Sequence, residues 1–220
     1  SELMSNANRV DEAIRLLQKG IIEPSIQDKG RLYADCATLM LNSGRQSEAI
    51  KLLELGLDTT DVSRRYSLYL CLSDCMLRDQ RPQEAMQCLQ TGIRDRLVKD
   101  PKELYRALAT LMISRGDVEC AVAILEDGIS STRVKDSLPL VHTLVQAMEE
   151  NGNSDYAVKL LKTLASRSRL RPEPSIYLLC AKLLFHSRKI DEAIHIGMQG
   201  IRTPGVKEKS SLYKMTAGYM

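Results

Sequence analysis

The sequence lacks any apolar run that approaches the roughly 18 consecutive residues of a membrane-spanning helix. Its first residues, 1–8, are polar and lack the charged start and apolar stretch of a secretory signal. No Asn-X-Ser/Thr acceptor for glycosylation occurs. Together with an apolar fraction of 44%, which is ample for burial, these absences predict a soluble, cytoplasmic protein.

Motifs for catalysis and metal binding are missing as well. The sequence has no phosphate-binding glycine loop and no nucleophile with a base at a recognisable spacing. Its three histidines lack metal spacing, and Cys71 and Cys75 share a helix face without the second pair that a tetrahedral site needs. We therefore expect no enzyme, no cofactor and no metal. The six cysteines, mostly at apolar positions, predict small buried residues in a reducing compartment.

What the sequence does contain is a repeat of 36 residues. One position of the repeat holds alanine in six copies without insertion or deletion: Ala13, Ala49, Ala85, Ala121, Ala157 and Ala193. A fixed period of this length predicts an array of units that contact only their neighbours, here one array over residues 1–220 without a domain boundary. Met4 and Met220 share a repeat position, and Leu212 and Tyr213 would lie on an open apolar face, so we expect a fragment of a longer protein.

Each repeat predicts two helices. Apolar residues over 29–41 follow the i, i+3, i+4, i+7 spacing of one helix face, which defines helix A. Residues 42–44 break this helix, and Ser47 offers a capping group for helix B, which continues through Leu57. A tyrosine recurs in helix A at Tyr33, Tyr69, Tyr105, Tyr177 and Tyr213. The predicted fold class is all-α, with tandem antiparallel helix pairs.

Glycine recurs at two positions of the repeat. The turn between helices A and B holds Gly44, Gly116 and Gly152, with Gln80 and Arg188 in the other copies. The end of helix B holds Gly20, Gly56, Gly92, Gly128 and Gly200. The second position has two interpretations, which are a left-handed helix terminus and close packing on the next helix A.

The repeat signature resembles the tetratricopeptide repeat in order and spacing, through Tyr33, Cys36, Ala37, Met40, Gly44, Ala49, Leu53 and Gly56. It departs from the family pattern in its period of 36 rather than 34, in its last glycine and in the absence of a constant proline. The resemblance implies a right-handed superhelical α-solenoid whose helices A line a concave groove that binds peptides. We therefore predict a protein–protein interaction scaffold within a larger protein or complex.

A neighbouring family, the pentatricopeptide repeat, binds single-stranded RNA with one base per repeat. Its base-reading position favours small polar side chains and corresponds here to Ala34, Leu70, Arg106, His142, Leu178 and Lys214. This set disfavours a base code. Helical-repeat RNA binding through a basic edge is the alternative function, and a regulatory or self-association domain of a multidomain factor is the third.

Two candidate surfaces follow from the tetratricopeptide geometry. The groove would be lined by Asp35, Thr38, Leu70, Asp74, Arg106, His142, Gln146, Leu178, Leu179 and Lys182. The exposed leucines in this set favour an apolar partner face. The loops from helix B to the next helix A are net positive and the opposite turns net negative, although the whole chain carries only +3. The resulting basic edge comprises Arg94, Arg96, Lys99, Lys102, Arg167, Arg169 and Arg171. It indicates an acidic protein or nucleic acid, unless these charges serve solubility alone.

The fifth repeat differs from the others at four packing positions together, which are Val141, Val145, Tyr156 and Leu164. This predicts a local change in helix crossing between residues 138 and 165. The change would be either a partner site or a plain packing variation.

Overall fold

The computed structural model describes residues 2–27, 29–59, 64–150, 152, 157–159, 161, 174–204, 206 and 209–220, which form helices and connecting turns with no strand among them. The chain divides into two compact units. The first comprises Ser1–Arg115 with Ser130–Asp136, and the second comprises Gly116–Ile129 with Ser137–Met220. The prediction of one array over residues 1–220 stays a prediction.

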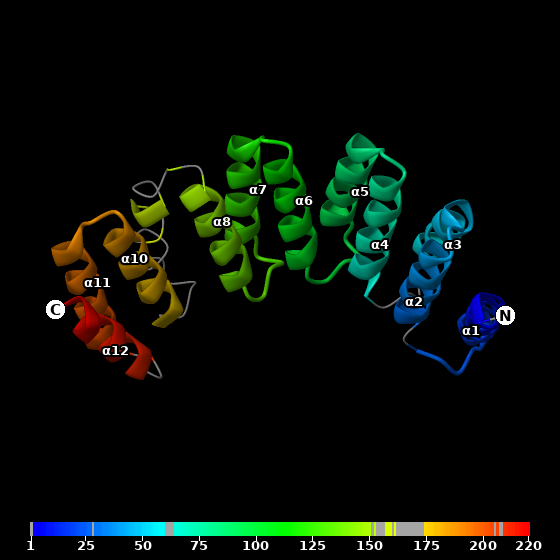
Figure 1. The fold of residues 1–220 in the computed structure, drawn as a ribbon, viewed down its shortest axis with the longest axis horizontal. Coiled ribbons are helices and arrows are strands. Elements are labelled where there is room, and N and C mark those ends of the chain that lie inside the picture. The colour runs from blue at the N-terminus through cyan, green and yellow to red at the C-terminus, as the bar shows by residue number, and fades with distance from the viewer. Residues whose placement is uncertain are drawn as a thin grey trace. The chain divides into compact units, whose positions relative to one another are not determined.

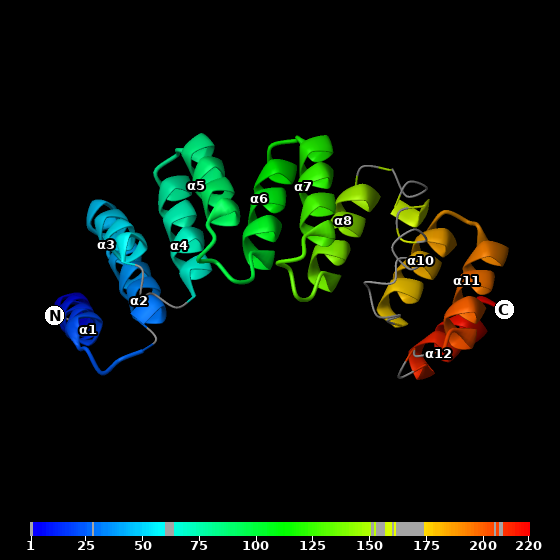
Figure 2. The ribbon, with the colours of Figure 1, turned by 180° about the vertical axis from the view of Figure 1, so that it is seen from behind.

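Helices follow one another in pairs within each unit. The first unit contains α1 (Glu2–Ile22), α2 (Lys29–Asn42), α3 (Gln46–Asp58), α4 (Arg65–Arg78), α5 (Pro82–Arg94) and α6 (Lys102–Ser114). The second contains α7 (Val118–Ser130) except its last residue, α8 (Leu138–Glu150), α10 (Pro174–His186), α11 (Ile190–Arg202) and α12 (Ser210–Tyr219). Figures 1 and 2 show from opposite sides that consecutive helices of the first unit lie alongside one another.

Packing beyond consecutive helices joins the helices A. α2 packs against α4, α4 packs against α6, and in the second unit α10 packs against α12. Within the described residues no comparable contact joins the helices B of the first unit, α3 and α5. The predicted all-α class of tandem antiparallel helix pairs is confirmed, whereas the right-handed superhelix stays a prediction. No helix in the described part of the chain is long and apolar enough to cross a membrane.

The turn from helix A to helix B uses a left-handed residue. Its φ is 75° at Gly44, 58° at Gln80, 81° at Gly116, 72° at Gly152 and 59° at Arg188. In the first of these turns the Gly44 N–H donates to Leu41 O at 3.0 Å, and the Arg45 N–H donates to Met40 O at 2.8 Å. This pair of bonds is a Schellman motif, which satisfies the last carbonyls of α2 and ends the helix. Backbone geometry therefore fixes the turn even where glycine is absent.

The start of helix B differs from the prediction. α3 begins at Gln46, and its N-cap residue Arg45 makes no side-chain cap bond. Ser47, the predicted capping residue, lies inside the helix. The Arg45 guanidinium instead donates to the Glu48 carboxylate at 2.9 and 2.6 Å, and Glu48 lies in the first turn, where negative charge is favoured by the helix dipole.

The recurrent alanines and tyrosines form the interface between the helices. Complete burial is found at Ala49, Ala85, Ala121, Ala157 and Ala193. The tyrosines of helix A are buried too, with exposed fractions of 5–7% at Tyr33, Tyr69, Tyr105 and Tyr177. Ala13 in α1 and Tyr213 in α12 are more exposed than these equivalents.

The glycine of helix B is a packing residue. A Cβ on Gly56 would lie 3.0 Å from Tyr33 Cδ1 and 3.1 Å from Leu68 Cδ1, and one on Gly92 would lie 2.7 Å from Tyr69 Cγ. These glycines therefore touch the ring of their own helix A and the leucine of the next. Neither glycine has a positive φ. Close packing is the correct interpretation at these positions, and the left-handed terminus is wrong.

The cysteines agree largely with the prediction of small buried residues. All six are free thiols. Cys36, Cys75, Cys88 and Cys180 are buried, Cys71 is half-buried and Cys120 is exposed. In the fifth repeat, Val141 and Val145 are buried in α8, whereas Tyr156 and Leu164 lie outside the described residues.

Candidate interaction surface

In the first unit, the predicted groove residues lie on three packed helices. Asp35 and Thr38 lie on α2, Leu70 and Asp74 on α4, and Arg106 on α6. Because α2 packs against α4 and α4 against α6, equivalent positions on these helices adjoin one another. The polar side chains are exposed, but Leu70 is half-buried. These side chains form a row of exposed polar groups, and Leu70 is less exposed than expected; a groove that binds a partner stays a prediction.

The charges of this row are paired within each helix. Arg31 Nε lies 3.7 Å from Asp35 Oδ2, Arg78 Nε lies 3.1 Å from Asp74 Oδ2, and Arg106 Nη2 lies 2.6 Å from a Glu103 carboxylate oxygen. Such exposed pairs contribute little to stability. They leave the row close to neutral, with both signs available to a partner.

The groove residues of the second unit lie on α8 and α10. His142, Gln146 and Lys182 are exposed, whereas Leu178 and Leu179 are half-buried. Full exposure, which was expected of these leucines, is therefore not found here either. Their part in binding stays a prediction.

The basic edge is divided between free and engaged side chains. Arg94, Arg96 and Lys99 are exposed. Lys102 is partly buried, and its Nζ lies 4.0 Å from Asp136 Oδ2. The remaining predicted members, Arg167, Arg169 and Arg171, lie outside the described residues.

Cations at the start of helix A, or just before it, cap the end of the preceding helix B. Arg65, the first residue of α4, donates to Leu57 O and Thr59 O at 2.7 Å each. Lys209, which has the same place in the repeat, donates to Ile201 O and to Thr203 O, the latter at 3.2 Å. Cations at a helix C-terminus satisfy its free carbonyls and complement its dipole.

Pro101 occupies this repeat position after α5 and has no charge to offer. Arg133, from the loop after α7, caps the end of α5 instead. Its Nη1 donates to Ile93 O at 2.7 Å, and its Nη2 donates to Asp95 O and Val98 O. Part of the positive charge at this edge is therefore structural. Sequence reasoning missed this role, although the basic residues at 29, 65 and 209 share one repeat position and were a signal for it.

Asp95 organises the turn between α5 and α6. Its Oδ2 accepts from Arg65 Nε at 2.9 Å and from Tyr69 Oη at 3.0 Å, and its Oδ1 accepts from the Leu97 N–H at 2.9 Å. Burial alone would raise the pKa of Asp95, but these donors outweigh it and hold the pKa below its ordinary value. The turn is thereby fixed, with Val98 buried and Leu97 50% exposed.

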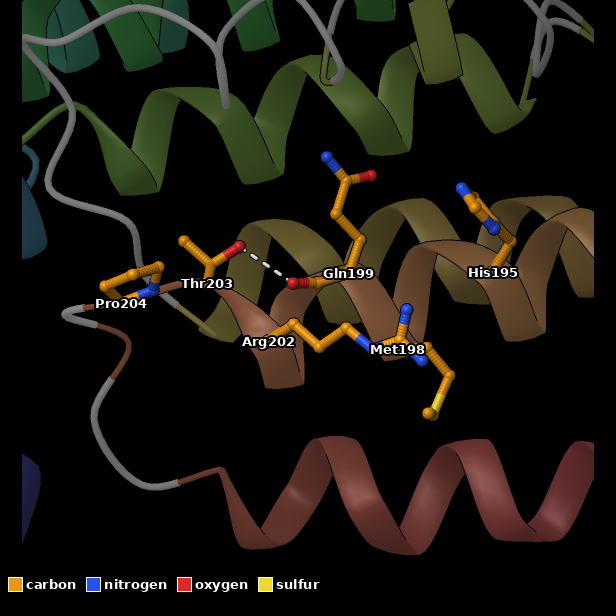
Figure 3. A pocket seen from close by; sticks show the side chains of 6 residues that line it. All are labelled: His195, Met198, Gln199, Arg202, Thr203 and Pro204. Atoms are coloured by element: carbon orange, nitrogen blue, oxygen red, sulfur yellow. Dashed lines mark hydrogen bonds between the residues drawn. The ribbon is translucent and has the colours of Figure 1, made fainter.

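A hollow of about 310 Å³ lies beside α11. Its lining consists of His195, Met198, Gln199, Arg202, Thr203 and Pro204. All six come from one helix and the turn after it, and Figure 3 shows that their side chains do not converge on a common point. The Thr203 hydroxyl donates to Gln199 O at 2.8 Å within the same helix turn. The described side chains therefore do not enclose a small ligand.

The buried thiols are expected to be unreactive at neutral pH. Burial raises the pKa of Cys75 to about 11 and that of Cys88 to about 12. The half-buried Cys71 also has a raised pKa, mainly through burial. Such thiols stay protonated at neutral pH and are poor nucleophiles and metal ligands. Among the described residues no group of histidine, cysteine or acidic side chains could hold a metal ion.

The described helices place the chain in the class of tandem helix-pair repeat proteins. No family model and no curated protein matches the chain. Solved structures that are similar include a thermophilic TPR protein of Thermus thermophilus, with 17% identity over 86% of this chain and 97% of the other and a TM-score of 0.43. Another is a set of TPR-like repeats from a putative kinesin light chain of Podosopora anserina, with 18% identity over 86% and 96% of the two chains and a TM-score of 0.46.

A third similar structure is YrrB, described as a TPR protein with an unusual peptide-binding site. It is 12% identical over 77% of this chain and 84% of its own, with a TM-score of 0.43. Two of these three structures are described as TPR proteins and the third as TPR-like repeats. The repeat architecture itself is established by the 36-residue period and the helix pairs of this chain.

Proposed function

We propose that the array is a protein–protein interaction scaffold that binds an extended partner segment along its helices A. The observation that supports this most is the row of exposed polar side chains over α2, α4 and α6, including Asp35, Asp74 and Arg106. The row is carried by helices whose spacing is fixed by buried tyrosine–glycine contacts. A rigid surface of this kind lowers the entropic cost of binding.

The dimensions favour a peptide over a small molecule. Packed helices lie about 8–10 Å apart, and an extended chain advances about 3.3 Å per residue, so about six residues would cross from α2 to α6. Both signs of charge lie along this path, next to half-buried Leu70. A partner with alternating charge around an apolar residue would fit it.

The test compares two variants of equal charge change. In the first, Asp35→Lys and Asp74→Lys alter the row. In the second, Glu54→Lys and Asp58→Lys alter exposed positions of α3, which is a helix B. Affinity capture from a cytosolic lysate, with nuclease and at moderate salt, should recover a discrete protein with the parent and the second variant. Loss of at least tenfold in the first variant alone supports the proposal, and equal recovery by both variants refutes it.

A second candidate contact is the turn between α5 and α6. Leu97 is exposed between the exposed cations Arg96 and Lys99 on a turn that Asp95 and Arg133 hold in place. We propose an acidic partner segment with one apolar residue for this turn, because charge attracts the segment and Leu97 offers an apolar contact.

Arg96→Glu with Lys99→Glu should weaken capture of such a partner, whereas Lys19→Glu with Lys51→Glu, on exposed positions of α1 and α3, should not. A partner lost on nuclease treatment, with binding that falls steeply with salt, would instead favour the alternative of RNA binding. The predictions of no enzymatic activity and no cofactor stay predictions, and an activity in the purified chain would contradict them.

A further inference from the structure

A stacked pair of aromatic rings joins α10 to α12 in the second unit. The ring centroids of Phe185 and Tyr219 lie 4.1 Å apart, and their planes are 9° from parallel. Phe185 is the only phenylalanine of the chain and is 39% exposed. α10 packs against α12, and Glu149 Oε1 of α8 lies 3.7 Å from His186 Nδ1 of α10. The exposed ring therefore belongs to a helix A that has a neighbouring helix A before it and after it.

Two further side chains of α10 share a face with this ring. Lys182 lies one helical turn before Phe185 and is exposed, and half-buried Leu178 lies one turn before Lys182. Residues three and four apart are neighbours on a helix, so these three residues form one strip, called here the α10 strip. Lys182 has the repeat position of Thr38 and Asp74, which belong to the row of the first unit. The α10 strip is therefore the equivalent of that row, with an aromatic ring added.

The charge of the α10 strip differs from that of the row in the first unit. In α2, α4 and α6 the arginines near the row are each paired with an acid of their own helix. α10 and α12 contain no aspartate and no glutamate. Their lysines, Lys182 and Lys214, are both exposed, and neither forms an ion pair within the described part of the chain. Positive charge that no acid neutralises therefore lies beside the exposed ring.

We propose that the α10 strip, together with Lys214 of α12, binds a partner segment in which an aromatic residue is flanked by acidic residues. The partner's ring packs against the exposed part of Phe185, because aromatic pairs are favoured beyond the apolar area that they bury. The acidic flank meets Lys182 and Lys214, which attract carboxylates and disfavour a basic partner. This inference rests on the proposed function, since it names the partner chemistry for the part of the helices A that α10 provides.

Glu149 gives the bound segment a direction. Its carboxylate is exposed on α8, on the side of α10 away from Lys214. It repels an acidic partner residue, so the acidic flank lies toward α12 and the aromatic residue lies over Phe185. Glu149→Gln removes this repulsion and should tighten binding, which is the opposite of the effect of removing a lysine.

The experiment is fluorescence polarisation of the 220-residue chain with short fluorescein-labelled peptides. Their central residue is Phe, Leu or Ala, and their flanks are glutamates or lysines. The parent should bind the Glu-flanked Phe peptide most tightly, and Lys182→Glu with Lys214→Glu should weaken this binding about tenfold or more. Lys19→Glu with Lys51→Glu makes the same change of charge at exposed positions of α1 and α3 and should bind like the parent. Circular dichroism melts check that each variant keeps its fold.

Phe185→Leu tests the ring, because leucine stays apolar at a partly exposed position but cannot stack. It should reduce the preference for the Phe peptide over the Leu peptide and leave the preference for acidic flanks. Equal weakening by both lysine pairs refutes the proposal, and so does a parent that binds no acidic peptide more tightly than its Lys-flanked counterpart. Binding of oligouridine that depends on Lys182, without binding of acidic peptides, would also refute it and favour RNA.

Failure of this inference can be distinguished from failure of the proposed function. Capture of a protein that is lost with Asp35→Lys and Asp74→Lys depends on the row of the first unit alone. If that loss is observed while the acidic peptides do not bind, the proposed function stands and only the assignment of the α10 strip is refuted.

Discussion

Replacing Gly92 with alanine should destabilise the first unit, although alanine is the better helix former. A Cβ at this residue of α5 would lie 2.7 Å from Tyr69 Cγ and 2.9 Å from Leu104 Cδ1. Both side chains are buried, so neither can move aside without disturbing its own packing. The gain in helix propensity is about 1 kcal/mol. The cost of overpacking is about 1–3 kcal/mol, so we expect a net loss of about 1 kcal/mol.

The same substitution at Gly218 is the matched control. A Cβ there meets nothing within 4 Å, so Gly218→Ala in α12 should be neutral or stabilise by up to about 0.5 kcal/mol. Gly20, whose Cβ would lie 3.2 Å from Leu32 Cδ1, should fall between the two. Repeat proteins depart from two-state unfolding, so urea midpoints at matched slopes are the appropriate measure.

The result that refutes this reasoning is a Gly92→Ala variant with an unchanged or raised midpoint. It would mean that helices α4 and α5 separate readily, and that the glycine position tolerates a side chain. Destabilisation by Gly218→Ala as large as that by Gly92→Ala would also contradict the steric explanation, because the two sites differ chiefly in what surrounds the new methyl group.

Three further perturbations have outcomes of definite sign. Gln80→Gly should stabilise the fold by about 0.5–1 kcal/mol and raise its thermal midpoint, because a left-handed residue with a Cβ is strained. Gly116→Ala should lower the midpoint for the same reason. A shift in the same direction for both variants would contradict this explanation. Asp95 has a lowered pKa in the folded state, so its stabilisation is present at neutral pH and is lost as the pH falls through that pKa. Asp95→Asn should therefore reduce the loss of urea resistance between neutral and acidic pH, and an unchanged pH profile would argue otherwise. Cys120 should react with a thiol reagent in the native protein, whereas Cys88, with a pKa raised to about 12, should react only in urea, and peptide mapping distinguishes the two.

The helices and turns of this fold could be predicted because they depend on contacts that recur every 36 residues. The period places helix A over 29–41, and α2 runs from Lys29 to Asn42. Tyr33 and Gly56 recur together because the ring of one packs on the backbone of the other. The start of α3 could not be predicted because the Arg45–Glu48 pair replaces the hydroxyl that Ser47 could have supplied.

The candidate surfaces could be predicted only in outline. Periodicity indicates that Asp74 is exposed, but it cannot give the burial of Leu70, which depends on how far the neighbouring helix extends over it. A count of charges likewise cannot separate the exposed Arg96 from Arg133, whose guanidinium is held by backbone carbonyls a full repeat away.

The end of α3 is capped by Arg65, whereas the end of α5 is capped by Arg133 from a different repeat position. The repeats are therefore not equivalent when a copy is gained or lost. If residues 64–99 were removed, Arg133 would have the same sequence separation from the end of α3 that it now has from the end of α5. The end of α3 would then keep a cation for Leu57 O and Thr59 O. Removing residues 136–171 would instead bring Glu173 and Gly205 into the two cation registers that follow α7, and neither carries a positive charge. We therefore expect two deletions of equal length to have unequal consequences for the helix ends that they join.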